Sequence, residues 1–384
     1  MSLAKRFLRV AAWYAGRPLP INPRKVVFCS YYGRGYSDNP KAIAQELLRR
    51  STDAQLVWLI RDQKEAATLP PGIRPCPYDS LQRVWELSTA KVWVDNCRKF
   101  DRFKKKGQFY LQTWHGFAFK RIEQDAQTVL EEPYIRGARH DSALTDLMVS
   151  NSRHMTRLFQ NSFWYSGAVA EFGNPRNDIF CAPQPELRSR VLAHWGLPEN
   201  CKLLLYAPTF RADHGLEAYQ IDLPRALEAC ERRFGGSWSA LIRLHPNVAA
   251  QSAGLFPYDG RGIVDATAYP DMQELLCAAD LLITDYSSSI FDYALRRRPC
   301  LQFALDLEAY RQDRNFYFPV DQLPFPLAAS NDALVKQILS FDEAAYLENW
   351  DQFYQAQGFC EDGHAAARCA DWIASRLTGK DGSL

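Results

Sequence analysis

The fold of this chain is constrained most strongly by two successive series of short apolar runs that alternate with amphipathic segments. In the first series the runs cover residues 25–32, 54–60, 90–96, 107–114, 146–151 and 168–173. After a stretch with proline and charge at residues 181–200, a second series covers residues 201–210, 239–246, 262–267, 280–288 and 299–306. Runs rich in Val, Leu and Phe without polar alternation indicate parallel strands covered on both faces, so the sequence predicts two doubly wound α/β units.

Two domains also agree with the length of 384 residues, which exceeds the usual size of a single hydrophobic core. We expect a basic helix at residues 1–22, a Rossmann-like domain at 23–190, a second one at 191–360, and a C-terminal helix at 361–384 that packs back on the first domain. Ligands of such sheets bind beyond the carboxyl ends of the strands. With two units facing each other, the sequence predicts an active site in the cleft between them.

The N-terminal end of the chain is basic. Residues 1–50 contain ten Lys or Arg and two acidic residues, although the net charge of the whole chain is only +2. At 100° per residue, the apolar face of the first helix carries Leu3, Phe7, Val10, Ala11 and Tyr14. Lys5, Arg6 and Arg9 lie opposite, with Trp13 on their side as a candidate interfacial anchor. The pattern fits either docking on an anionic membrane surface or packing of this helix on its own domain.

Missing motifs exclude several classes of function. The sequence has no GxxxxGK[ST] phosphate loop, no complete dinucleotide fingerprint, no GxSxG elbow and no RNA-binding or zinc-finger signature. Its ten cysteines include no CxxC pair and no convincing metal-ligand spacing. No apolar run reaches the roughly 18 residues of a membrane span, and basic residues interrupt the place of a secretory signal. We therefore expect a cytoplasmic protein with buried thiols, no metal, no cofactor and no nucleic-acid partner.

Polar residues gather where the predicted strands end. His115 and Gly116 follow one strand, and GNPRND (residues 173–178) follows another. In the second series, APTFRAD (207–213), IRLHPN (242–247) and TDYSSS (284–289) take the same position, and Asp306 follows the fifth strand. Because the carboxyl ends of parallel strands meet at one edge of a sheet, these side chains are typical of a site and not of a core.

The TDYSSS stretch has the most readable chemistry. Ser287 and Ser288 stand where a helix starts, and a helix N-terminus offers unpaired N–H groups and partial positive charge. This predicts a phosphate or pyrophosphate cradle, with simple N-capping by serine as the alternative. Arg211 and Arg243 lie at neighbouring strand ends, where guanidinium groups bind phosphate oxygens, and His245 follows two residues after Arg243.

Six stretches together point to a known family. They are SYYGRGYSDNPKAI, QTWHG…K, GNPRND, YAPTFR, RLHP and TDYSSSIFDYALRRRPCLQFALDLEAYRQDRNFYF. In this order, between residues 25 and 320, they resemble the CDP-glycerol glycerophosphotransferase family of teichoic-acid primases, polymerases and capsule polymerases. The resemblance implies a GT-B fold whose second domain holds the nucleotide. It also implies transfer of glycerol phosphate from CDP-glycerol to a hydroxyl of a lipid-linked or polymeric acceptor, with release of CMP, at the inner face of the cell membrane.

The resemblance and the strand-end positions together assign roles. His115 is expected to act as general base on the acceptor hydroxyl, with His245 as the second catalytic histidine. The nucleotide and pyrophosphate are expected to contact Arg211, Arg243, Thr209, Thr284, Asp285, Ser287, Ser288 and Asp306. The acceptor side is expected to include Gly116, Lys120, Ser30, Gly33, Asn39 and Asn174.

One departure from the family pattern keeps alternatives open. After His115 and Gly116 the family tends to have Thr-Pro-Leu-Lys, whereas this chain has Phe117-Ala118-Phe119-Lys120. The difference indicates a changed acceptor preference, or a relative that uses CDP-ribitol or another polyol phosphate. A GT-B glycosyltransferase that uses a nucleotide sugar is the second enzyme hypothesis, and a membrane-docked nucleotide-binding protein is the non-enzyme hypothesis. Primase or polymerase activity and the oligomeric state stay open.

Overall fold

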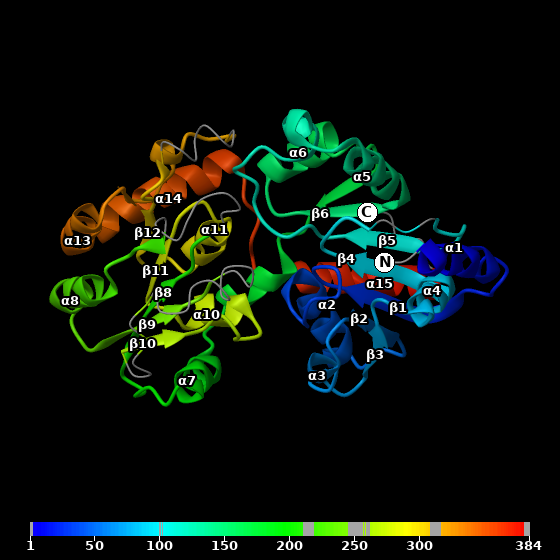
Figure 1. Cartoon of the computed structure of the whole chain (residues 1–384), viewed down its shortest axis with the longest axis horizontal. Coiled ribbons are helices and arrows are strands. Elements are labelled where there is room, and N and C mark those ends of the chain that lie inside the picture. Colours follow the sequence, from blue (N-terminus) through cyan, green and yellow to red (C-terminus); the bar gives the residue numbers. More distant parts are fainter. Residues whose placement is uncertain are drawn as a thin grey trace. The chain divides into compact units, whose positions relative to one another are not determined.

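The structure of the protein is a computed structural model that describes residues 3–99, 101, 103–209, 219–244, 256, 258, 262–307 and 316–379 (Figure 1). The chain divides into two compact units. Unit 1 comprises Met1–His115, Ile122–Asp178 and Gly358–Leu384, and unit 2 comprises Gly116–Arg121 and Ile179–Gln357. The chain therefore passes from one unit to the other four times, where the sequence analysis expected domain boundaries after residues 190 and 360.

Unit 1 is built on a parallel sheet in the order β3-β2-β1-β4-β5-β6-β7. Its strands are β1 (Asn22–Cys29), β2 (Gln55–Ile60), β3 (Ile73–Pro77), β4 (Ala90–Asp95), β5 (Phe109–Gln112), β6 (Leu147–Ser150) and β7 (Ala168–Glu171). Its helices are α1 (Leu3–Gly16), α2 (Asp38–Arg49), α3 (Gln63–Ala66), α4 (Leu81–Thr89), η1 (Glu123–Val129), α5 (Glu132–Leu144), α6 (Arg153–Ser162) and α15 (Ala365–Thr378), and η2 (Pro175–Phe180) spans a crossing. The predicted parallel α/β sheet is confirmed for this unit.

Strand β3 is the strand of unit 1 that the sequence analysis missed. Its sequence, IRPCP, contains two prolines, which donate no hydrogen bond to a sheet ladder. The strand is compatible with the sheet because it lies at the edge and pairs with β2 alone, from Ile73 opposite Leu56 onward.

Helix α1 packs on unit 1 through Trp13. This side chain is 2% exposed, and its ring lies 6.3 Å from that of Trp93 and 5.4 Å from that of Phe103. Helix α1 lies beside α4 (Figure 1), where Gly16 comes too close to Ser88 for a Cβ atom to fit. The prediction that Trp13 is an interfacial anchor is therefore wrong, because the indole fills the core under α1.

The C-terminal helix α15 also belongs to unit 1. It packs against α2 and against strands β4 and β1. Cys369, Ala370 and Ile373 are buried in the same cluster as the strand residues Val26 and Val92. The last helix of the chain thus completes the core that the first strands begin.

Unit 2 repeats the architecture with a parallel sheet in the order β10-β9-β8-β11-β12-β13. Its strands are β8 (Lys202–Tyr206), β9 (Trp238–Ile242), β10 (Ile263–Asp265), β11 (Leu281–Thr284), β12 (Cys300–Phe303) and β13 (Leu327–Ala328). Its helices are α7 (Pro185–His194), α8 (Leu223–Phe234), α10 (Met272–Ala278), α11 (Ser289–Ala294), η4 (Val320–Gln322), α13 (Asn331–Leu339) and α14 (Glu343–Gln357). In the part of the chain that the structure describes, no helix combines the length and the apolar character needed to cross a membrane.

Candidate active site

His115 lies three residues beyond the end of β5, in a main chain with unusual conformation on both sides. Trp114 has φ +53° and Gly116 has φ +140°. A non-glycine residue with positive φ is uncommon and is often held in place at a functional site. Glycine is required at position 116, because a side chain there would strain the main chain. The turn therefore fixes the direction in which the imidazole points.

The imidazole of His115 is held in one tautomer. Its Nδ1 lies 2.6 Å from the carbonyl oxygen of Asn96, which only accepts hydrogen bonds, so Nδ1 carries the proton and donates it. Trp114 stacks on the ring at a centroid distance of 4.3 Å, and Tyr31 meets its edge at 5.8 Å. In the neutral ring, Nε2 is left with the lone pair, which is the state that a general base needs.

The surroundings of His115 favour its neutral form. Burial lowers the pKa of His115 below its ordinary value of 6.5, and the hydrogen bond to Asn96 and the charge of Asp38 offset this effect only in part. A pKa below 6.5 leaves the imidazole uncharged at neutral pH. The group can then accept a proton without first losing one.

A buried bracket supports the main chain on both sides of His115. Arg176 donates to the carbonyl oxygen of His115 at 3.0 Å and forms a buried ion pair with Asp38. Asn39 donates to the carbonyl oxygen of Trp114 at 3.1 Å. Burial alone would raise the pKa of Asp38, but the charge of Arg176 and further hydrogen bonds outweigh it and lower this pKa. The bracket therefore keeps its charges and holds the turn.

A second buried ion cluster lies behind Trp114. Arg98 pairs with Glu123 and Asp141 at 2.8 and 3.2 Å, and its guanidinium stands 5.8 Å from the Trp114 ring and 4.9 Å from the Phe163 ring. Its side chain and those of both carboxylate partners are at most 3% exposed. The indole that stacks on His115 thus rests on a fixed, fully buried cation.

The GNPRND motif ties the C-terminal segment of the chain to this region. Asn174 is 4% exposed, and its main-chain N–H and the Asn177 side chain both donate to Glu361, at 2.9 and 3.0 Å. Asp178 accepts from the N–H groups of Ala365 and Ala366 at the start of α15. The side-chain nitrogen of Asn174 has no hydrogen-bond partner among the described residues. Asn174 was expected on the acceptor side, which stays a prediction, and the motif as a whole links the C-terminal segment to the bracket around His115 through Arg176.

The other residues expected on the acceptor side of unit 1 are also buried or structural. The Ser30 hydroxyl is fully buried and lies 3.4 Å from the Asn96 side-chain nitrogen. Gly33 has φ +83°, and a Cβ there would stand 2.8 Å from the ring of Tyr78. Asn39 is also fully buried. Of these residues, Asn39 bonds directly to the turn of His115, and neither the Ser30 nor the Asn39 side chain is exposed to a ligand.

In unit 2, Asp285 organises the loops that follow β8 and β11. Its carboxylate accepts from the Thr209 main-chain N–H at 2.9 Å, from the Thr209 hydroxyl and from the Tyr286 N–H. Thr284, beside it, donates to the carbonyl oxygen of Ala207 at 2.6 Å. Asp285 and Thr284 are at most 1% exposed. Both side chains therefore bind the protein itself and set the position of the serines that follow.

The serines at the start of α11 are partly exposed. The hydroxyls of Ser287 and Ser289 lie 2.9 Å apart, and Ser288 stands at the cap position without a capping side-chain hydrogen bond. The Tyr286 hydroxyl donates to Asp306 at 3.2 Å. The Lys120 ammonium lies 6.0 Å from the centre of the Tyr286 ring, so this residue, expected on the acceptor side, belongs to unit 2 and lies near the residue that precedes Ser287.

Three residues singled out in the sequence need separate mention. Arg243 donates to the carbonyl oxygens of Ala266 and Tyr269 at 3.2 and 2.6 Å, so part of its guanidinium supports the loop after β10. Arg211 and His245 lie outside the described residues. Their expected roles stay predictions.

Sequence analysis missed Tyr31, Asn96, Asp38 and Arg176, which hold His115. Asp38 and Arg176 stood inside the motifs SYYGRGYSDNPKAI and GNPRND, in the segments that follow β1 and β7: Asp38 begins α2 and Arg176 lies in η2. Opposite charges beyond two strand ends of one parallel sheet were the available signal. The role of Asn96 had no signal, because its main-chain carbonyl makes the contact.

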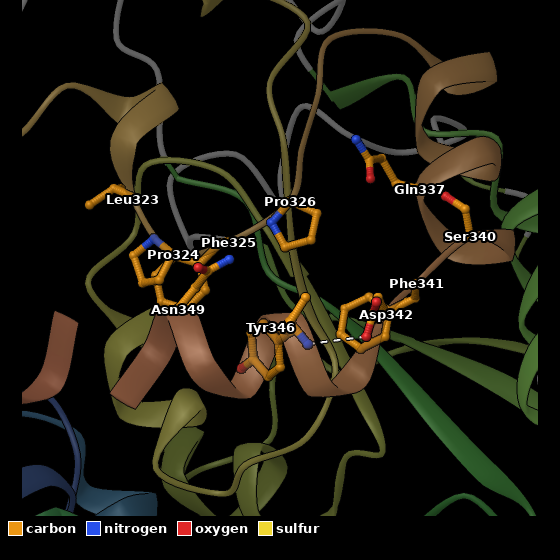
Figure 2. Close-up of a pocket in the computed structure, with 11 residues that line it drawn as sticks. Leu323, Pro324, Phe325, Pro326, Gln337, Ser340, Phe341, Asp342, Tyr346 and Asn349 are labelled. Atoms are coloured by element: carbon orange, nitrogen blue, oxygen red, sulfur yellow. Dashed lines mark hydrogen bonds between the residues drawn. The ribbon is translucent and has the colours of Figure 1, made fainter. Parts of the chain in front are cut away.

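A pocket of about 330 Å³ in unit 2 lies apart from these residues (Figure 2). Phe325, Pro326, Phe341, Tyr346 and Asn349 are among its lining residues. Pro326 directly precedes β13, whereas the expected phosphate-binding residues follow the ends of their strands. In a parallel sheet these are opposite edges, so the pocket is not part of the candidate active site.

The chain is similar to known proteins over nearly its whole length. The sequence model of the family described as CDP-Glycerol:Poly(glycerophosphate) glycerophosphotransferase matches residues 14–375. The teichoic acid glycerol-phosphate transferase of Staphylococcus aureus is 31% identical over 92% of this chain and 93% of that protein. The teichoic acid poly(glycerol phosphate) polymerase of Staphylococcus epidermidis is 30% identical over 92% of this chain and 51% of that protein. The chain thus spans about half the length of that polymerase. Ribitol-phosphate enzymes of teichoic acid synthesis are also among its relatives.

Solved structures agree with this similarity. The wall teichoic acid polymerase TagF has a TM-score of 0.86 and 28% identity to this chain, and the match covers 98% of this chain and 95% of that one. A variant of the same polymerase with CDPG has a TM-score of 0.85. Together with the two parallel sheets, these neighbours confirm the predicted GT-B-like fold class with two Rossmann-like domains.

Proposed function

The chain belongs to the CDP-Glycerol:Poly(glycerophosphate) glycerophosphotransferase family, and we propose that it moves glycerol phosphate from CDP-glycerol to a hydroxyl group of a lipid-linked or polymeric acceptor and releases CMP. One observation carries the proposal within this chain. His115 is a neutral imidazole whose Nδ1 proton is committed to the Asn96 carbonyl oxygen at 2.6 Å. That arrangement suits a base that acts through Nε2 on an acceptor hydroxyl.

In the proposed reaction, Nε2 of His115 takes the proton of the acceptor hydroxyl. The acceptor oxygen then forms a bond to the phosphorus that carries glycerol, and the bond from that phosphorus to the CMP oxygen breaks. CMP leaves with the electron pair of the broken bond. Phosphoryl transfer of this kind depends mainly on positioning and on electrostatic stabilisation. The tautomer lock and the bracket of Arg176, Asp38 and Asn39 supply positioning.

Unit 2 is proposed to hold the donor. Ser287 and Ser288 at the start of α11, with Lys120 near Tyr286, offer hydroxyl, N–H and ammonium groups to the pyrophosphate. Thr284 and Asp285 fix this loop from behind. Arg211, Arg243 and His245 are proposed to add positive charge at the departing CMP, and Asp306 to meet a ribose or glycerol hydroxyl.

We also propose that the protein binds peripherally to the anionic lipid surface at the inner face of the cell membrane. Leu8 and Tyr14 on α1 are 55% exposed, and Leu81 and Trp85 on α4 are 53% and 52% exposed. Helices α1 and α4 pack against each other, and Lys or Arg residues crowd the start of the chain. Single exposed apolar residues are ordinary, but a group beside a basic segment favours a lipid surface.

A comparison of several nucleotide donors tests the proposed transfer reaction. CMP release, or UDP release for a sugar nucleotide, would be measured with CDP-glycerol, CDP-ribitol and UDP-sugars, each with and without a glycerophosphate-primed acceptor. We expect acceptor-dependent release from CDP-glycerol at the highest rate. Release from CDP-ribitol alone would make the protein a ribitol phosphate transferase, and release from a UDP-sugar would make it a glycosyltransferase. Tight CDP-glycerol binding without turnover across several acceptors would favour the binding-protein hypothesis.

A further inference from the structure

The segment Gly116–Arg121 belongs to unit 2, although the residues before and after it belong to unit 1. It contains the Phe-Ala-Phe sequence that was assigned above to acceptor preference. Phe117 is 1% exposed and Phe119 is 2% exposed. Side chains buried this deeply cannot meet an acceptor, so their role needs another explanation.

Both phenylalanines, called the aromatic anchor from here on, pack against Phe291. The ring of Phe117 lies 4.6 Å from that of Phe291, and the ring of Phe119 lies 5.5 Å from it. Phe117 also approaches Phe318 and Phe353, each at 6.1 Å. Aromatic pairs at these separations contribute more than their buried area alone.

The main chain of the segment is attached to unit 2 as well. The Tyr317 N–H donates to the carbonyl oxygen of Phe119 at 2.7 Å, and Lys120 forms an antiparallel bridge with Phe316. The rings of Phe119 and Phe316 are stacked at 5.5 Å. The segment is thus fixed by its side chains and by its main chain together.

The partner of the anchor belongs to the helix that starts at the proposed donor site. Phe291 follows two residues after Ser289, the first residue of α11, and Ser289 pairs with Ser287. On the other side of the anchor, only Gly116 separates Phe117 from His115. Since consecutive Cα atoms are about 3.8 Å apart, the Cα atoms of His115 and Phe117 are at most about 7.6 Å apart.

From these contacts we propose that Phe117 and Phe119 are positioning residues for the transfer reaction. By fixing the main chain directly after His115 to helix α11, they restrict the movement of the turn that carries the general base. Neither ring touches a substrate. The inference rests on the proposed function for the identity of the reaction, whereas the anchoring itself is a property of the protein alone.

The test compares alanine and leucine variants of the two anchor residues with a variant elsewhere in the same aromatic cluster. Phe117→Ala and Phe119→Ala remove the anchor, and Phe117→Leu and Phe119→Leu restore apolar volume. Phe325→Ala is the matched control, because Phe325 is 4% exposed and also packs on Phe291, at 5.6 Å, but lies outside Gly116–Arg121. Thermal unfolding of every variant would show how far each one weakens the cluster.

The first measurement is amide hydrogen exchange without ligand, which does not depend on catalysis. We expect exchange of residues 115–121 to become about tenfold faster or more in the two alanine variants, to return towards wild type in the leucine variants, and to stay at the wild-type rate in Phe325→Ala. Unchanged exchange in the alanine variants, or equal acceleration in Phe325→Ala, would contradict the proposed anchoring of residues 116–121 by Phe117 and Phe119.

The second measurement separates kcat from KM in acceptor-dependent CMP release. We expect the alanine variants to lose about tenfold to a hundredfold in kcat with an unchanged KM for CDP-glycerol, because a displaced base slows the chemical step and leaves donor binding intact. The leucine variants should recover most of kcat, and Phe325→Ala should keep it. An unchanged kcat in the alanine variants would overturn the positioning role. A wild type that releases no CMP would instead overturn the proposed function, and the exchange measurement would still decide on the anchor.

Discussion

The turn of His115 in unit 1 and the serine start of α11 in unit 2 are built in opposite ways. Around His115, the polar groups are bound to each other in one arrangement: Nδ1 to Asn96, and the main chain to Asn39 and Arg176. The groups of this bracket are almost fully buried. A general base needs one orientation and one tautomer, and these buried hydrogen bonds provide both.

At the start of α11, hydrogen bonds fix the buried residues behind the serines, whereas the serine side chains themselves can change partners. Asp285 is buried and bound to Thr209, whereas Ser287 to Ser289 are partly exposed and Ser288 makes no capping side-chain bond. Hydroxyls of this kind can exchange a serine partner for a phosphate oxygen. In the proposed reaction, this difference suits unit 1 to hold a proton acceptor and unit 2 to receive a ligand.

The largest effect is expected when the buried bracket around His115 is disrupted. Arg176→Met leaves Asp38 buried without its cation, which should lower the free energy of unfolding by about 3–5 kcal/mol and reduce kcat as the turn loosens. Urea unfolding and CMP release would measure both. Arg297→Met is the control, because the Arg297–Asp351 pair is about half exposed and should contribute about 1 kcal/mol or less. Equal losses in the two variants would contradict the bracket.

The variant Asp285→Asn tests the second region, the serines at the start of α11. The amide of asparagine is uncharged and keeps only one acceptor oxygen, so the hydrogen bonds from Thr209 should weaken and the loop behind the serines should loosen. We expect a rise in the KM for CDP-glycerol equivalent to about 1–3 kcal/mol, with a smaller change in kcat. Steady-state kinetics with varied donor would measure this. A loss confined to kcat would remove the distinction between the two regions.

Gly116→Ala sharpens the comparison at the residue where the chain passes from unit 1 to unit 2. Position 116 has φ +140°, so a side chain should cost about 1–3 kcal/mol in strain and displace His115. Gly235→Ala is the control: Gly235 also has positive φ, at +67°, with open space around it. Both variants should lose stability in thermal unfolding, but only Gly116→Ala should also lose kcat. Similar kcat values would show that the turn tolerates movement.

The pH dependence follows from the neutral state of His115. Burial lowers the pKa of His115 below 6.5, so the imidazole is the free base above this pKa and becomes protonated as the pH falls through it. The rate kcat/KM should therefore be flat near neutral pH and fall about tenfold per pH unit on the acid side, with a midpoint below 6.5. A pH–rate profile would measure the midpoint. A midpoint above 6.5 would contradict the neutral resting state.

The smallest effect is expected for the exposed residues of α1 and α4. Leu8→Ala with Trp85→Ala should leave stability and activity on a soluble acceptor nearly unchanged, because both side chains are more than half exposed. Binding to vesicles of anionic lipid should weaken by about threefold to tenfold, as apolar contact with the lipid is lost. Vesicle sedimentation would measure this, with neutral vesicles as the control. Unchanged binding would remove the membrane role of this face.

Much of the fold was predictable because strand periodicity and apolar runs depend on local sequence. The two series of strands were found, while β3 was missed because of its prolines and β13 because it has only two residues. For the candidate site, the positions of residues along the chain were predictable, whereas the contacts between their side chains and main chain were not. His115 was found from its place after a strand, but its partner is the main chain of Asn96, which the sequence does not mark.

The Phe-Ala-Phe segment shows the same limit in another form. The sequence Phe-Ala-Phe beside His115 predicts a changed acceptor preference or another polyol phosphate donor, which stays a prediction, but it did not show that Phe117 and Phe119 are buried against Phe291. Trp13 is a similar case, because helical periodicity placed it on the basic face and the contacts of α1 with α4 placed it in the core. Tertiary packing determines where these phenylalanines and Trp13 lie, and sequence periodicity carries no information about that packing.

The most direct test of the account is acceptor-dependent CMP release from CDP-glycerol by the wild type and by His115→Ala, with donor binding and thermal unfolding measured on the same samples. The account predicts a loss of roughly 10²- to 10⁴-fold in kcat with donor binding and folding retained, because the variant lacks the base and nothing of the donor site. A loss of less than about tenfold in a folded variant that binds the donor would contradict the role of His115 as the general base.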